Sequence, residues 1–135
     1  MSAPAEQWLA FAQVDLRMAE LAMEEGIYAQ VCFHAQQCVE KTLKGLLAQT
    51  RGLVPRTHRL TDLVESIDLP QHPLQDIAWE VKLLERYYIP TRYPDALPSG
   101  LPDGMPNEAD AREALEVARK SLERVTRFIQ ERGEM

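Results

Sequence analysis

Polar side chains recur along one stripe of a strongly helical stretch between residues 27 and 49. Spacings of three, four and three residues put four of them on one face of an α-helix: His34, Gln37, Lys41 and Lys44. Ammonium, imidazole and amide groups side by side can bind a phosphate or another acidic group. The alternative is an ordinary solvated face, on which Glu40 and Lys44 form a helical ion pair worth about 0.3–0.5 kcal/mol.

A second cluster lies where a helical pattern ends, in residues 87–95. It holds three tyrosines and an arginine beside two prolines, and its candidate binding residues are Tyr88, Arg92 and Tyr93. Such groups on a stiffened backbone can stack on a base or clamp a phosphate. They can equally pin the chain to the rest of the fold, with Arg92 paired to a carboxylate such as Asp15 or Asp95.

Two other polar residues call for a structural explanation. Asp15 lies between Ala12 and Ala19 on an apolar helical stripe, where a carboxylate is costly unless it is paired. We expect a lysine, arginine or tyrosine of a neighbouring helix to satisfy it. His58 opens a short helical pattern just after Arg56, and we expect a structural or capping role for it.

No pattern indicates a metal site, a cofactor site or a catalytic residue. The three histidines, at 34, 58 and 72, are scattered without an accompanying set of ligands. There is no glycine-rich phosphate loop, nucleophile elbow or pair of catalytic carboxylates. Spacing alone therefore provides no enzyme signature.

The elements that must position these residues are helical. Apolar residues recur at spacings of three and four in five segments: Ala5–Glu24, Ile27–Gln49, a short helix capped by Thr57, a fourth from about Pro73 to just before Pro90, and Asn107–Arg132. No segment alternates with a period of two. The sequence predicts an all-α protein, a five-helix up-and-down antiparallel bundle in one domain over residues 1–135.

The long connection from Tyr88 to Asn107 is the exception to otherwise short links. Prolines stand at every fourth position, 90, 94, 98, 102 and 106, and each follows an apolar residue. Combinations of proline with Asp, Ser and Gly favour a chain of tight turns. We expect an ordered strap between the fourth and fifth helices, pinned to the bundle by the apolar side chains before its prolines. Loops of this length are uncommon unless they are functional or disordered, so a disordered loop is the alternative.

The charge and composition of the chain argue against some classes of function. The chain carries 15 basic and 21 acidic residues, a net charge of −6, which argues against broad charge-driven nucleic-acid binding but leaves room for a local basic patch. No apolar run approaches the ~18 residues of a membrane span. Cys32 and Cys38 point about 240° apart on one helix and cannot bond to each other. These features predict a cytoplasmic protein without membrane contact.

The residues also resemble those of a known family. A block from Phe33 to Leu47 with the order Gln-Gln-x-x-Glu-Lys-x-x-Lys, preceded by Asp15-Leu16 and the segment 26–29, is similar to the signature of HEPN domains (higher eukaryotes and prokaryotes nucleotide-binding). Residues 57–60 and the segment 91–95 continue the pattern in the same order. The resemblance covers nearly the whole chain.

This resemblance implies a five-helix bundle that forms a homodimer and handles nucleotides or RNA. Many bacterial members work beside a minimal nucleotidyltransferase as a toxin–antitoxin or two-component pair. The implied groove combines the helical stripe with the aromatic cluster, so that cationic groups hold phosphate while a tyrosine stacks the base.

A large branch of the family consists of metal-independent RNases, whose motif is an arginine and a histidine with four to six residues between them near the fourth helix. Here no histidine follows Arg86 or Arg92, and the pair Arg51 and His58 lies outside the expected helical position. Three functions therefore stand: a nucleotide- or RNA-binding module with a nucleotidyltransferase partner, a purely structural or interaction bundle, and an atypical RNase toxin.

Overall fold

The computed structural model describes residues 1–88 and 105–133, and this part of the chain contains five α-helices and no strand. The helices are α1 (Ala3–Glu24), α2 (Tyr28–Arg51), α3 (Leu60–Glu65), α4 (Ala78–Leu83) and α6 (Glu108–Gly133), and two 3₁₀ turns, η1 (Gln75–Ile77) and η2 (Leu84–Tyr87), flank α4. The all-α class is confirmed. No helix in these residues is long and apolar enough to cross a membrane.

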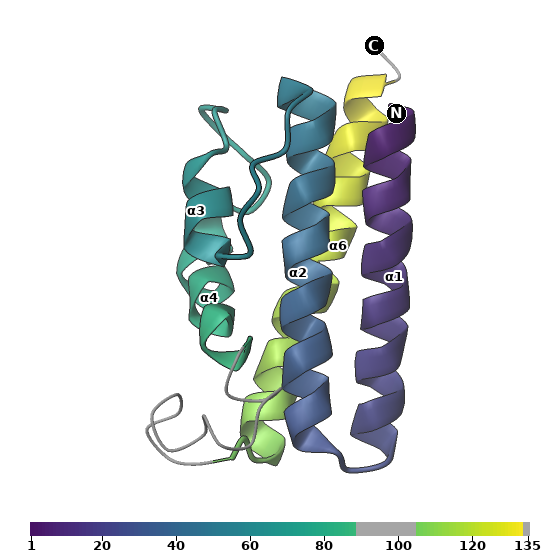
Figure 1. Cartoon of the computed structure of the whole chain (residues 1–135), viewed down its shortest axis with the longest axis vertical. Helices are drawn as coiled ribbons and strands as arrows, with labels where there is room; N and C mark the ends of the chain where they lie inside the picture. Colours follow the sequence, from purple (N-terminus) through teal and green to yellow (C-terminus); the bar gives the residue numbers. More distant parts are fainter. Residues whose placement is uncertain (89–104, 134–135) are drawn as a thin grey trace.

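Helix α2 is the centre of the bundle (Figure 1). Helix α1 runs antiparallel beside it, α6 packs behind the pair, and the short helices α3 and α4 cover the opposite side of α2. The start of α1 and the end of α6 lie at the same end of the molecule. Because α2 has neighbours on several sides, its sequence must supply apolar residues over most of its circumference.

The helix ends follow from local chemistry. Ser2 caps α1 by accepting a hydrogen bond from the backbone N–H of Ala5 at 3.2 Å. Gly26 and Gly52 follow α1 and α2 with φ of 71° and 72°, a left-handed conformation that glycine adopts without a steric penalty. At α6, Asn107 and Asp110 each accept a hydrogen bond from the other's backbone N–H, at 2.9 and 3.0 Å, which confirms the predicted cap.

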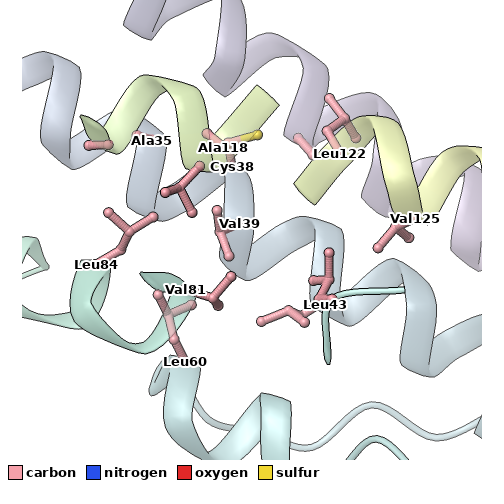
Figure 2. Packing of buried hydrophobic residues seen from close by; sticks show 14 of the residues in the cluster. Ala35, Cys38, Val39, Leu43, Leu60, Val81, Leu84, Ala118, Leu122 and Val125 are labelled. Carbon is pink, nitrogen blue, oxygen red and sulfur yellow. The ribbon is translucent and has the colours of Figure 1, made fainter. Parts of the chain in front are cut away.

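The core forms around α2 and is continuous through the bundle. Figure 2 shows Val39 and Leu43 of α2 close to Leu60 and Val81 of the α3 and α4 layer, while α6 supplies residues such as Val125. All five are fully buried. At about 25 cal/mol per Å² of apolar surface removed from water, such side chains are the main source of stability.

Two sequence predictions about helix boundaries are wrong. Thr57 does not cap α3, whose N-cap is Arg59; the Thr57 hydroxyl instead accepts from the Arg59 N–H at 3.1 Å and donates to Asp62 at 3.0 Å. The predicted fourth helix is not continuous, because 3₁₀ turns replace both ends and leave an α4 of six residues. Most of the predicted proline-rich loop, residues 89–104, lies outside the described residues.

Candidate functional site: a polar strip along α2

Five polar residues form a strip on α2, which we call the α2 strip: His34, Gln37, Glu40, Lys41 and Lys44. Asp15 of α1 and His58 of the segment between α2 and α3 both contact the strip, and in Figure 1 α1 and that segment run along different sides of α2. The strip is not a freely solvated face, because Glu40 and Lys44 are only 4% and 6% exposed. The predicted ion pair between Glu40 and Lys44 is confirmed at 3.1 Å, but the predicted solvated face is wrong at this end of the helix.

The first of two clusters on the strip is centred on Asp15 of α1. His34 Nδ1 lies 2.9 Å from Asp15 Oδ1, and Lys41 Nζ donates to Oδ2. Burial by itself would raise the pKa of Asp15, but the hydrogen bonds from His34 and Lys41 together outweigh it and lower the pKa below its ordinary value. The carboxylate therefore stays ionised and holds both basic side chains in place.

The second cluster is centred on Glu40 of α2. Its Oε2 accepts from Lys44 Nζ at 3.1 Å and lies 3.0 Å from Nδ1 of His58. The other carboxylate oxygen, Oε1, is buried and has no hydrogen-bond partner among the described residues. Each of the two carboxylates thus contacts one lysine of α2 and one histidine, which comes from α2 at Asp15 and from the segment before α3 at Glu40.

Aromatic rings flank the Glu40 cluster. The rings of His58 and Tyr88 stack with centroids 5.7 Å apart and an interplanar angle of 13°. Lys44 Nζ lies 5.3 Å from the ring centroid of Trp8, within cation–π range. The cluster therefore combines positive charge with flat apolar surfaces.

The structure brings most of the sequence-predicted residues to these two places. His34 and Lys41 meet at Asp15, whereas Lys44 and Tyr88 lie around Glu40 and His58. Gln37 lies between them on the strip and donates to Gln36 Oε1 at 2.7 Å. The remaining two candidates, Arg92 and Tyr93, lie outside the described residues.

Sequence reasoning missed parts of the site. Trp8 is half-buried and contacts Lys44, but its place in the apolar stripe of α1 concealed any role in a site. Glu40 looked like one half of an i,i+4 pair, and nothing local indicated its contact with His58. Asp15 has the expected lysine of a neighbouring helix, Lys41, as a partner, and it also has His34, which was not expected. Among the described residues, no group of three or more His, Cys, Asp or Glu could hold a metal ion.

Comparison with known proteins places this bundle in a family. The family model described as "HEPN domain" matches residues 5–129. The chain belongs to the HEPN family. The family resemblance predicted from the residues of α1, α2 and the region after α4 is thus confirmed, and the α2 strip is a feature of a HEPN bundle.

Relatives of this HEPN chain include proteins from archaea and bacteria. A protein of Methanocaldococcus jannaschii named "Putative toxin MJ1304" is 26% identical over 130 residues, which span 90% of this chain and 85% of the relative. The crystal structure of TT1696 from Thermus thermophilus has a TM-score of 0.76 at 38% identity and covers 93% of this chain and 98% of that one. The crystal structure of ST0689, an archaeal HEPN homologue, has a TM-score of 0.72 at 35% identity, with 93% and 97% covered.

Proposed function

We propose that this HEPN chain binds a nucleotide or RNA along the α2 strip. The observation that carries the proposal is the pair of carboxylates, Asp15 and Glu40, each of which holds a lysine of α2 and a histidine beside the α2 strip. A lysine has three donors and commits only one to its carboxylate, so donors remain for phosphate oxygens. Because the two carboxylates already hold the lysine and histidine side chains in position, these side chains lose less conformational entropy when a ligand binds.

The experiment uses charge-pair variants, because removal of Lys41 alone would leave the buried Asp15 carboxylate without a permanent counter-charge, with only His34 as a partner. The variant Asp15→Asn/Lys41→Gln neutralises both members of the ion pair between α1 and the α2 strip. The matched control, Glu20→Gln/Arg119→Gln, neutralises an exposed pair of 3.1 Å between α1 and α6. Both variants leave the net charge of the chain unchanged.

We expect the strip variant to bind ATP and a short single-stranded RNA more weakly than wild type, and the control to bind as wild type does. Loss of one phosphate contact should also reduce the slope of log K against log salt by about 0.7. Fluorescence anisotropy of a labelled RNA over a salt series measures both quantities. Equal binding by the two variants, or no binding by wild type, would contradict the proposal.

We further propose that the chain forms a homodimer and partners a minimal nucleotidyltransferase in a toxin–antitoxin-like or two-component system. The name of the M. jannaschii relative supports a toxin-like setting.

An exposed apolar stripe on α1 supports the homodimer interface. Phe11, Val14 and Met18 are 58%, 61% and 45% exposed at spacings of three and four. Sedimentation of wild type and Val14→Glu at micromolar concentration tests the dimer, and a wild-type monomer would contradict it.

A further inference from the structure

A cleft of about 320 Å³ opens beside the Glu40 cluster, where α1, α2 and the segment before α3 meet. Its walls are Trp8, Lys44 and residues 54–58. This volume lies at the lower end of the ~300–1,000 Å³ typical of small-molecule pockets. The cleft is thus large enough for a small ligand but not for a folded partner.

One part of the cleft wall is cationic. Lys44 is buried and held by Glu40, and the exposed His58 is held by the same carboxylate oxygen. Arg56 is exposed and makes no hydrogen bond or ion pair with any other described residue, so its guanidinium is available to a ligand. The described residues that line the cleft carry two permanent positive charges, on Lys44 and Arg56, and no carboxylate. The cationic part of the wall therefore favours an anion.

The rest of the wall is flat and apolar. Trp8, Val54 and Pro55 are half-buried and line the same space. An indole provides a stacking surface for any base, because every base has a π face. A phosphate alone would leave this apolar surface unused, and an apolar ligand would leave Arg56 unused.

We propose that this cleft binds one nucleotide unit, with its base against Trp8 and its phosphate at Arg56 and Lys44. The unit is a free nucleoside monophosphate or one nucleotide of an RNA strand. The inference rests on the proposed function and adds the position at which a single nucleotide binds. Glu40 contacts no ligand in this arrangement and acts as a positioning residue for Lys44 and His58.

The two tryptophans of the chain allow a direct test. Trp8 lines the cleft, whereas Trp79 on α4 is 70% exposed and does not line it. In a ¹H–¹⁵N spectrum, the Trp79→Phe variant assigns the two indole N–H signals. We expect AMP to shift the Trp8 signal saturably and to leave the Trp79 signal in place. Adenosine and inorganic phosphate should each give weaker binding, because each uses one part of the wall.

A matched pair of variants tests the phosphate contact. Arg56→Gln should weaken AMP binding about tenfold or more, since a charge-assisted hydrogen bond to the phosphate is lost. Arg127→Gln removes the same charge from an exposed position on α6 and should bind AMP as wild type does. Equal weakening in both variants would overturn the proposal, because it would indicate a general charge effect.

A titration with RNA, followed both by anisotropy and by the Trp8 signal, distinguishes a failure of the cleft proposal from a failure of the proposed function. A Trp8 shift with RNA but not with AMP supports the cleft and identifies the unit as part of a strand. RNA binding by anisotropy without a Trp8 shift in either titration overturns the cleft proposal and leaves the proposed function standing. Absence of binding to both ligands overturns both.

Discussion

His58 Nδ1 lies 3.0 Å from Oε2 of Glu40, a contact that ties the segment before α3 to the middle of α2. The same oxygen accepts from Lys44, so one buried carboxylate sets the positions of two basic groups at the edge of the cleft. Both depend on a side chain that has no other hydrogen bond among the described residues. This dependence makes Glu40 the most informative residue to change.

Glu40→Gln should lower the free energy of unfolding by about 3–5 kcal/mol, because it leaves the buried Lys44 ammonium without a counter-charge. Glu40→Gln/Lys44→Met removes that charge as well and should be less destabilised than the single variant. Urea denaturation measures both free energies. A double variant at least as unstable as Glu40→Gln would show that the buried charge is not the cause.

The pH dependence of stability should report the Asp15 cluster. The pKa of Asp15 is lowered in the folded state, so its contribution is present above the ordinary Asp pKa of ~3.9 and is lost as the pH falls through the folded value. Wild type should therefore be more stable than Asp15→Asn at neutral pH, and the difference should shrink below about pH 4.

Denaturant unfolding over a pH series measures this difference, and Asp68→Asn is the control. Asp68 is exposed and has no ion pair with the other described residues, so this variant should stay within about 0.5 kcal/mol of wild type throughout. A wild-type advantage over Asp15→Asn that persists unchanged in acid would contradict the assignment.

The two cysteines should be inert in the folded protein. Both are fully buried, and burial raises the pKa of Cys32 and of Cys38 to about 12. Because the thiolate is the reactive form, iodoacetamide at about pH 8, near the ordinary thiol pKa of ~8.5, should leave the native chain unmodified and label both sites in urea. Mass spectrometry counts the adducts, and rapid labelling of the native chain would contradict the burial.

The core around α2 should be sensitive to truncation. Leu43→Ala removes a fully buried side chain that packs in the centre of the bundle (Figure 2) and should cost about 2–5 kcal/mol. Leu53→Ala makes the same chemical change at a side chain that is 71% exposed and should cost less than about 0.5 kcal/mol. Thermal and urea unfolding compare the two, and similar losses would argue against α2 as the centre of the core.

The sequence determined the long helices, because their signals are local. The apolar stripes of α1, α2 and α6 recur every three to four residues, Gly26 ends α1, and Asn107 with Asp110 caps α6. The residue order of α2 also identified the family. Short segments carry fewer repeats, so the same reasoning placed the start of α3 and the continuity of the fourth helix incorrectly.

Only the tertiary structure decided which polar residues meet. Asp15 and Lys41 are 26 positions apart, and Glu40 and His58 are 18 apart, so no helical periodicity relates them. Their contacts depend on how α1 and the segment before α3 pack on α2. Packing also decided that Glu40 and Lys44 are buried and not a solvated pair. The sequence identified most of the candidate residues, and the packing of the helices placed their side chains around the carboxylates of Asp15 and Glu40.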